Sequence, residues 1–402
     1  DLHYPLRRQR QMCIRDRVRR ISADQHLAFL QDWASPGSQA CETVSFLQTP
    51  AWAQVKTDWR SESIGIVRDG TELLGVGLVL YRQVPKLHRY LAYLPEGPVM
   101  DWSSPELPEI LTALRSHVKS RGAFALRIGP TLPHRVWAKD TIKAAIADES
   151  VTALSEVPAD RTNRRATYLA NQLRHLGWRP PKDEQGFAAG QPKFNFQLPL
   201  VRWKDGERVR LSEDEVLAGM NQLWRRNIRK AAKKGVEVVP GGRDDLAAFH
   251  TVYLETAERD SFTPRPLEYF EHMWDALNAE DPDRMHVYLA RHESDVVAAT
   301  TWIHVGRHCW YSYGASTNAK REVRGSNAIQ WQMIQDAIAV DADVYDMRGI
   351  TEGLTADDPE LGLIKFKVGS GGQAVSYIGE WDLVIDPLLY KAFDLYMERR
   401  SR

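Results

Sequence analysis

The chain has 402 residues, of which 43% are hydrophobic and 26% charged, values typical of a globular protein long enough for two domains. Its 53 basic and 53 acidic residues cancel, so any contact with nucleic acid has to come from a local basic patch. Three widely spaced cysteines, Cys13, Cys41 and Cys309, argue against a disulfide framework or a zinc site and favour a reducing, cytoplasmic compartment. No apolar run reaches about 18 residues, so the sequence predicts no transmembrane helix.

The first residues need separate treatment. Residues 1–20 are rich in arginine, show no periodicity and include the tract QMCIRDRV, which looks like a translated sequencing artefact. A basic, acid-poor start could also be a targeting peptide or a nucleic-acid arm, although it lacks the apolar stretch of a secretion signal. We expect residues 1–20 to be disordered or spurious and exclude them from the fold.

The stretch FLQTPAWAQVK, residues 46–56, predicts a helix that opens after Pro50. Trp52 and Val55 would face the core of a first domain. Lys56 would point either to solvent or into a cleft between domains, and its spacing alone favours solvent.

One unit of sequence occurs twice. Residues 66–81 and 289–304 each predict a β-hairpin, with turns at Asp69–Gly70 and Glu293–Ser294. Each hairpin is followed by a strand and loop, a helix with apolar residues at helical spacing, and a further strand. Because element order and spacing match, we predict an internal duplication. The two predicted helices are Ser104–Ser120 and Asn327–Val340.

This order of elements is that of the GNAT acyltransferases, in which one strand splays from its neighbour and the opened backbone holds an acyl donor. The loop before the next helix normally holds a pyrophosphate on N–H groups at the helix N-terminus. Residues 321–327 of the second copy fit that pattern loosely. Residues 95–99 of the first copy do not fit, since prolines remove donors and Glu96 would repel phosphate. We therefore predict an α/β (α+β) fold of two tandem GNAT-like domains, without coenzyme A binding.

The segment between the copies, residues 140–190, is rich in charge, proline and glycine and contains a helix-like stretch over 166–176. Residues 193–200 alternate apolar and polar side chains and predict the first strand of the second domain. We therefore place the first domain at 21–190 and the second at 191–374.

A strongly basic helix is predicted early in the second domain. Ser212 and Glu215 form a capping box, and residues 221–235 then combine an apolar stripe with a C-terminal Gly235. Trp224 is interpreted as a core residue. The cations of this helix are Arg225, Arg226, Arg229, Lys230, Lys233 and Lys234. They form either a solvated helix face or a phosphate-binding face for tRNA or a nucleotide-linked substrate.

Two further regions carry candidate chemistry. Arg259 and Arg265 flank an aromatic-rich loop, interpreted as structural with substrate contact as the alternative. Near the C-terminus, GLIKFKVGSGG at 362–372 is interpreted as a glycine-rich turn, where a lysine could stabilise an oxyanion or a phosphate. No Ser/His/Asp order, His-rich spacing or Walker motif is present in the sequence, so we predict no metal and no covalent mechanism.

Together these segments resemble the Fem family (FemABX), transferases that build peptidoglycan cross-bridges from aminoacyl-tRNA. The resemblance covers residues 45–386 and rests on FLQTPAWAQVK, LAYLPEGPVMD, WRRNIRKAAKKGVEV, YSYGAST, SNAIQWQMI, YDMRGI, GLIKFKVGSGG and IGEWDLVID. It implies aminoacyl-tRNA as co-substrate with no further cofactor. It also implies an acceptor amine on the stem peptide of lipid II or of soluble UDP-MurNAc-pentapeptide. With the lipid-linked acceptor, peripheral contact of the protein with the inner face of the membrane stays open.

The resemblance also implies roles for particular residues. Lys56 resembles the lysine that binds acceptor phosphates, and Phe366–Lys367 resembles the pair at the tRNA acceptor end, with Lys367 stabilising transition-state charge. Residues 375–402 are expected to return to domain one. Leu254–Met285 lacks the heptads of a coiled-coil arm, so the chain resembles the compact members. The candidate residues besides the basic helix are Lys367 and Asp346 as catalytic, and Lys56, Trp52, Tyr313, Arg321, Arg348 and Phe366 as substrate-binding.

An aminoacyl ester is already activated, so an amine can attack it once the amine has lost its proton, which in lysine has a pKa of ~10.4. Asp346, Glu352 and Asp357 are candidate bases. Three other functions stay open: an N-acyltransferase that uses acyl-CoA, a non-catalytic RNA-binding protein, and an aminoacyl-tRNA:protein transferase.

Overall fold

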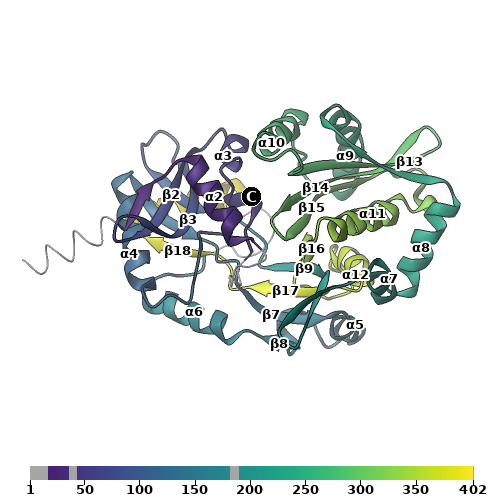
Figure 1. The fold of residues 1–402 in the computed structure, drawn as a ribbon, viewed down its shortest axis with the longest axis horizontal. Helices are drawn as coiled ribbons and strands as arrows, with labels where there is room; N and C mark the ends of the chain where they lie inside the picture. Colours follow the sequence, from purple (N-terminus) through teal and green to yellow (C-terminus); the bar gives the residue numbers. More distant parts are fainter. Residues whose placement is uncertain (1–16, 36–42, 182–189, 402) are drawn as a thin grey trace, which may run out of the picture. The chain divides into compact units, whose positions relative to one another are not determined.

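The structure, a computed structural model, describes residues 17–35, 43–181 and 190–401 (Figure 1). The chain separates into two compact units, each built from segments that are discontinuous in sequence. Unit 1 consists of Asp1–His134, Asn163–Lys193 and Tyr377–Arg402, and unit 2 of Arg135–Thr162 and Phe194–Ser376. Each unit is a mixed sheet with helices packed on it, which confirms the α/β fold class.

The division differs from the predicted boundaries in two places. Arg135–Thr162 belongs to unit 2 instead of the first domain, because Trp137 is fully buried in the core of unit 2. Val18–Arg20 was expected to lie outside the fold but forms a strand paired with Ile64–Ile66. The buried side chain of Val18 anchors this strand in the core of unit 1. Residues 1–16, and with them Cys13, lie outside the described residues, as does Cys41.

Unit 1 is a twisted sheet in the strand order β1-β2-β3-β4-β6-β18, with β5 paired to β3. Its elements are β1 (Val18–Arg20), α2 (Ala23–Trp33), η1 (Phe46–Gln48), α3 (Trp52–Val55), β2 (Arg60–Arg68), β3 (Glu72–Gln83), β4 (Tyr90–Leu94), β5 (Val99–Met100), α4 (Leu107–Ser120), β6 (Ala123–Ile128), α6 (Arg164–His175), β18 (Trp381–Val384) and α13 (Pro387–Ser401). Strand β18 pairs antiparallel with β6, so the C-terminal segment adds a strand to this sheet.

Helices cover the sheet of unit 1 on its two faces. The apolar sides of α4 and α6 bury Leu114, Val118 and Leu173 in one core cluster with β2, β3 and β6. Helix α13 packs Tyr390 and Phe393 into a second cluster with β4 and β6.

Unit 2 is a longer sheet in the order β12-β13-β14-β15-β16-β9-β17-β7-β8. Its elements are β7 (Pro133–Ala138), α5 (Lys139–Ala147), η2 (Leu154–Glu156), β8 (Arg161–Thr162), β9 (Phe194–Pro199), β10 (Val201–Lys204), β11 (Glu207–Arg210), α7 (Glu213–Gly219), α8 (Gln222–Lys233), β12 (Val236–Gly241), η3 (Arg243–Asp245), α9 (Leu246–Asp260), α10 (Leu267–Glu280), β13 (Met285–His292), β14 (Asp295–Val305), β15 (His308–Ser316), η4 (Arg321–Val323), α11 (Gly325–Ala339), β16 (Val344–Gly349), α12 (Leu361–Gly369) and β17 (Gln373–Tyr377).

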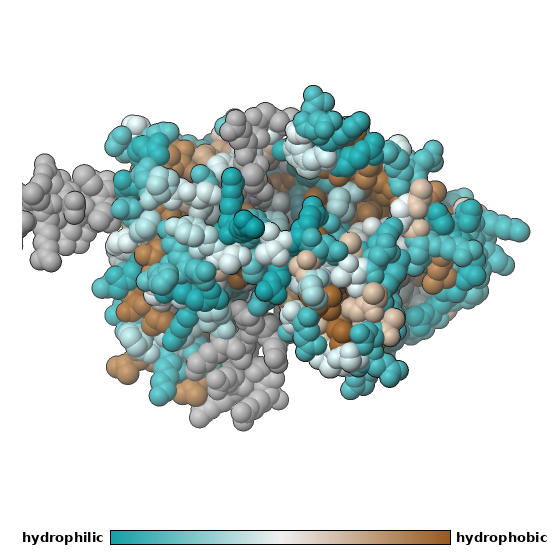
Figure 2. All heavy atoms as spheres, turned by 90° about the horizontal axis from the view of Figure 1, so that it is seen from below, coloured by the Kyte–Doolittle hydropathy of each residue, from teal (hydrophilic) through white to brown (hydrophobic). Residues whose placement is uncertain are grey.

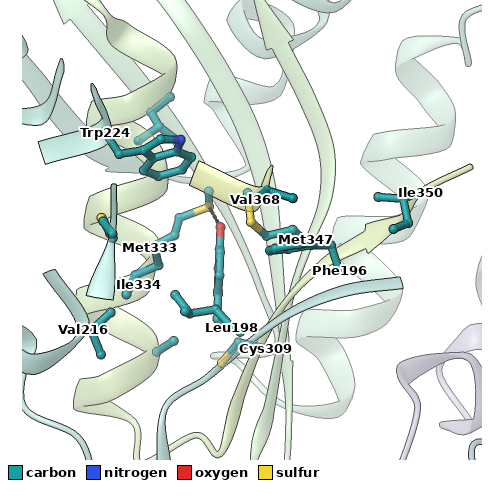
Figure 3. Close-up of a cluster of buried hydrophobic side chains, with 14 of the residues drawn as sticks. Phe196, Leu198, Val216, Trp224, Cys309, Met333, Ile334, Met347, Ile350 and Val368 are labelled. Carbon is teal, nitrogen blue, oxygen red and sulfur yellow. Dashed lines mark hydrogen bonds between the residues drawn. The ribbon is translucent and has the colours of Figure 1, made fainter. Parts of the chain in front are cut away.

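The central strand β14 is buried at every position from Val297 to Ile303. Since successive side chains of a strand point to opposite faces, both faces of the sheet must be covered here. Helices α9 and α11 both pack on β14 and therefore lie on opposite faces (Figure 1). Figure 3 shows the core on the α11 side, where Met333 and Ile334 lie against Leu198 of β9, near Met347 of β16.

The predicted duplication is visible in both units. The two hairpins turn at Asp69–Gly70 and Glu293–Ser294, and Asp69, Gly70 and Glu293 all have positive φ. Each hairpin is followed by a strand, a helix and a parallel strand, which are β4, α4 and β6 in unit 1 and β15, α11 and β16 in unit 2. Leu254–Met285 contains parts of α9 and α10 without a long arm, as its lack of heptads predicted.

On the face drawn in Figure 2, hydrophilic residues predominate and hydrophobic residues form small separate patches. Within 17–35, 43–181 and 190–401, no helix combines the length and apolar character that crossing a membrane requires.

Candidate functional site

The sheet of unit 2 opens between β15 and β16. These strands pair in parallel only over His308–Trp310 and Val344–Asp346, although β15 continues along β14 to Ser316. In unit 1 the equivalent strands β4 and β6 pair along the whole of Tyr90–Leu94. The splay typical of an acyl-donor site is therefore present in unit 2 and not in the described sheet of unit 1.

A pocket of about 410 Å³ lies at the N-terminus of α11. Its lining includes Lys320, Arg321, Arg324 and Lys365 but no carboxylate side chain. Lys320 is paired with Glu293 and Asp295 across the β13–β14 turn. The other three cations form no ion pair with an acidic side chain in the described part of the chain, so the pocket has an excess of positive charge suited to an anion.

Two details indicate that this pocket is built for a polar ligand. Asn327 is 5% exposed, and its Oδ1 accepts a bond from Asn227 Nδ2 of α8 at 3.2 Å, whereas its own Nδ2 has no partner within the described residues. The first turn of α11 also lacks a side-chain cap, and Arg324 precedes it with φ of 67°. Free donors at a helix N-terminus are a ready site for phosphate.

The segment GLIKFKVGSGG differs from its prediction as a turn. Its greater part is the helix α12, and the positive-φ turn begins only at Gly371. The helix packs on the start of α8, where Trp224 Nε1 donates to Phe366 O at 2.8 Å. Gly369 is required by this packing, because a Cβ there would lie 2.3 Å from Trp224 Cδ1. Trp224 is a core residue, as predicted, and Phe366 lines the pocket.

Lys367 is buried, with 3% of its surface exposed. Its Nζ donates to Gly349 O at 2.7 Å and to Arg348 O at 3.4 Å. Burial lowers the pKa of Lys367 to about 7, although the negative charge of Asp346 opposes this shift. The ammonium is thus held by the backbone at the end of β16 and titrates near neutral pH.

Asp346 is also buried, at 2% exposure, and its carboxylate accepts three hydrogen bonds. Burial opposes its ionisation, but its partners, His308 foremost, hold the pKa of Asp346 below its usual value. A carboxylate that is ionised, enclosed and fully bonded is poorly suited to take a proton from a substrate amine. The other candidate bases, Glu352 and Asp357, are exposed on the loop between β16 and α12.

Tyr313 lies in an aromatic cluster with the first turn of α10. Its hydroxyl is 3.4 Å from that of Tyr269, and its ring meets Phe270 edge-on at 5.0 Å. The guanidinium of Arg265 lies 5.0 Å from the centre of the Tyr269 ring. The segment interpreted from sequence as a structural loop thus places the exposed Arg265 and, in the first turn of α10, the half-buried Tyr269 beside Tyr313. The signal for it was the dense run of aromatic and arginine residues at 259–270.

The basic helix is α8, which begins after the side-chain cap Asn221 and packs against α11 (Figure 1). Arg225 and Lys230 are half-buried and the remaining four cations are exposed. None of the six forms an ion pair with an acidic residue within the described chain. The helix therefore presents uncompensated positive charge to solvent beside the pocket-lining residues at its own N-terminus.

In unit 1, Lys56 ends the short helix α3, and its ammonium lies 5.3 Å from the centre of the Trp52 ring. Trp52 is 5% exposed and packs edge-on against Phe46. Trp52 can therefore hold Lys56 in place, but it offers no open face for stacking on a substrate.

Sequence reasoning missed a buried acidic network in unit 1. The hydroxyl of Tyr93 donates to Glu380, and Arg127 forms two bonds of 2.7 and 2.8 Å with Asp382. Because Arg127 is engaged by Asp382, it approaches Glu380 only to 3.8 Å. Burial raises the pKa of Glu380 to about 7, against the charge of Arg127. A carboxyl that titrates near neutrality is a candidate for acid–base work.

This network gives a prediction for stability. The pKa of Glu380 is higher in the folded state than in the unfolded state, so the folded protein binds an extra proton between about pH 4.5 and 7. We expect this contribution to stability to be present at low pH and lost as the pH rises through that window, by up to ~3 kcal/mol. Glu380→Gln should remove it. Denaturant titrations of both proteins at pH 5 and pH 8 check this, and parallel pH profiles would contradict it.

Comparison with solved structures gives the class of the fold. The crystal structure of FemX matches with a TM-score of 0.74 and 22% identity, covering 94% of this chain and 99% of that one. A tandem GNAT protein from the clavulanic acid biosynthesis pathway matches with a TM-score of 0.50 and 9% identity, covering 92% and 98%. The fold is therefore that of a protein with two tandem GNAT-like domains.

The FemAB family matches residues 38–293 and 283–397. The chain belongs to this family, as the resemblance indicated. Among its relatives, a UDP-N-acetylmuramoylpentapeptide-lysine N(6)-alanyltransferase of Weissella viridescens is 28% identical over 345 residues, covering 85% of this chain and 90% of the relative. A lipid II:glycine glycyltransferase of Staphylococcus aureus (strain MRSA252) is 24% identical over 425 residues, covering 89% and 92%.

Proposed function

We propose that this protein transfers an amino acid from aminoacyl-tRNA to the side-chain amine of the stem peptide in a peptidoglycan precursor. Relatives that align over most of the chain are named for transfer to the lysine of UDP-MurNAc-pentapeptide and to lipid II. The observation that carries the choice of donor is the cationic pocket at the start of α11, in the unit whose sheet opens between β15 and β16.

The pocket suits the phosphates at the acceptor end of a tRNA. Arg321, Arg324 and Lys365 can neutralise phosphates, while Asn327 Nδ2 and the N–H groups of Gly325 and Ser326 at the start of α11 can donate to their oxygens. Phe366 lines the same pocket and offers an apolar surface for the terminal base or ribose. The exposed cations of α8 extend this positive surface along the tRNA.

The reaction needs positioning more than activation. The acceptor amine, once deprotonated, forms a C–N bond to the ester carbonyl, the ester C–O bond breaks, and the terminal ribose hydroxyl leaves with a proton. Aminoacyl-tRNA and the precursors occur together in the cytoplasm, and we propose that location for the enzyme. With a lipid-linked acceptor it would work at the inner face of the membrane.

The direct test incubates the purified protein with a panel of charged tRNAs and with lysine- and diaminopimelate-type muramyl pentapeptides, free and lipid-linked. We expect the acceptor mass to rise by one aminoacyl residue with at least one pair. Transfer from acyl-CoA, or to a protein N-terminus, would replace this function with another transferase activity. Equal binding of charged and uncharged tRNA without turnover would indicate an RNA-binding protein.

The basic helix gives a separate prediction about binding. Replacing Lys233 and Lys234 with glutamine should weaken tRNA binding at low salt and lower the slope of log Kd against log salt by about one for each phosphate that is no longer neutralised. Filter binding of charged tRNA between about 50 and about 200 mM salt checks this. An unchanged slope would mean that the exposed face of α8 is solvated and does not bind the phosphates of tRNA.

A further inference from the structure

We propose that Asp346, the backbone of Arg348 and Lys367 form a clamp that fixes the opening between β15 and β16, so that both side chains act as positioning residues for the acyl donor. This inference rests on the proposed function for its catalytic consequence. The clamp itself is a property of the folded chain and can be measured without substrate.

The clamp lies where the sheet branches. Asp346 pairs with Trp310 in the last parallel rung between β16 and β15, and with Gln197 of β9 on its other side. Beyond this rung β16 loses its regular register with β9 until Gly349 pairs with Asn195. The two intervening residues form the bend by which β16 leaves β15.

The carboxylate of Asp346 ties three strands together at this bend. Its Oδ2 accepts from Gln197 Nε2 at 2.9 Å and from His308 Nε2 of β15 at 3.2 Å. Its Oδ1 accepts from the N–H of Arg348 at 2.6 Å. Arg348 has φ of 62°, in the left-handed region that an arginine rarely adopts. The side chain of Asp346 therefore holds Arg348 in the conformation that produces the bend.

Lys367 secures the other side of the same bend. Its Nζ binds the carbonyl oxygens of Gly349 and Arg348 from within α12. Asp346 accepts from the N–H of Arg348, and Lys367 donates to the carbonyl oxygens of Arg348 and Gly349. The two side chains therefore bind the donor and the acceptor groups of one short backbone segment. Both are almost fully buried, so their hydrogen bonds to the backbone fix the shape of the opening that receives the donor.

Hydrogen exchange tests the clamp in the protein alone. In Asp346→Ala the amide of Arg348 loses its acceptor and should exchange at least about 10-fold faster. In Asp346→Asn one oxygen still accepts from Arg348, while the turned amide of Gln197 and a ring nitrogen of His308 can accept from the new NH2 group. The exchange rate should then stay within about 3-fold of wild type. Lys367→Met should also speed this exchange, whereas Lys365→Met, on the exposed side of α12, should not.

Transfer kinetics test the catalytic consequence. We expect Asp346→Ala to lower kcat by about 100-fold, the cost of misplacing a reacting group by about 1 Å, and Asp346→Asn to stay within about 10-fold of wild type. An unchanged Arg348 exchange rate in Asp346→Ala would overturn the clamp. Loss of turnover in Asp346→Asn with normal exchange would make Asp346 a direct proton acceptor instead. If the wild-type protein transfers no amino acid, the proposed function fails, but the exchange rates still test the clamp. If Asp346→Ala does not fold, the Asp346→Asn and Lys367→Met variants supply both the exchange rates and the kinetic constants.

Discussion

Replacement of Lys367 by methionine is expected to lower kcat about 100-fold while the KM for the muramyl acceptor changes less than about 3-fold. Methionine keeps the apolar stem but lacks the donors that bind the Gly349 and Arg348 carbonyls in the buried site. The donor would then lie in a less defined opening, which costs transition-state alignment more than binding of the acceptor. Steady-state kinetics with each substrate varied in turn give the two constants.

The pH dependence adds an independent check on Lys367. Because the pKa of Lys367 is lowered to about 7, its protonated fraction falls as the pH rises through neutrality. If the charged form is the active one, kcat/KM of wild type should have an alkaline limb near pH 7, and this limb should be absent in Lys367→Met. Lys365→Met removes an exposed cation of the pocket and should lower kcat/KM for charged tRNA at every pH, but it should keep the limb. Wild-type kinetics in the methionine variant would discard any role for Lys367.

The second large effect is expected at the pocket before α11. Reversing Arg321 and Arg324 to glutamate replaces two positive charges of the pocket with two negative charges. We expect kcat/KM for charged tRNA to fall about 100-fold, because two phosphate-binding cations are removed and each new carboxylate repels the tRNA backbone. The KM for the acceptor should stay within about 2-fold, because only the donor side is altered.

The matched control reverses Lys86 and Arg89, two exposed cations of the β3–β4 connection in unit 1, with the same change in net charge. This variant should keep wild-type kinetics at about 150 mM salt, where exposed charges outside the pocket are largely screened. Equal losses in both variants would mean that the tRNA responds to net charge alone. An unaffected Arg321/Arg324 variant would place the donor elsewhere.

The duplication could be predicted from the sequence because its signals are local. The two hairpin turns depend on Asp69–Gly70 and Glu293–Ser294, and the two helices on apolar residues at helical spacing. Turn chemistry and periodicity involve residues a few positions apart, so they can be read without the fold. The same holds for the basic helix and its cap, and the order of these segments also indicated the family.

Tertiary structure decided the state of the candidate groups. Lys367 reads in sequence as a lysine before a glycine-rich turn, yet the fold buries it in α12. Burial lowers its pKa to about 7, although the charge of Asp346 opposes this shift. Glu380 carried no signal at all, because its pKa is raised by burial, against the opposing effects of Arg127 and Tyr93, which lie far from it in the sequence. Burial and charge are set by long-range neighbours that only the packed chain assembles.

The sequence by itself thus determined the repeated elements, the GNAT-like fold and the family. Only the tertiary structure decided that Arg135–Thr162 joins unit 2, and that the sheet opens between β15 and β16 and stays closed between β4 and β6. The reason is physical: local preferences select helices, strands and turns, but the register at which strands part depends on distant side chains such as Gln197, His308 and Lys367 meeting at one bend.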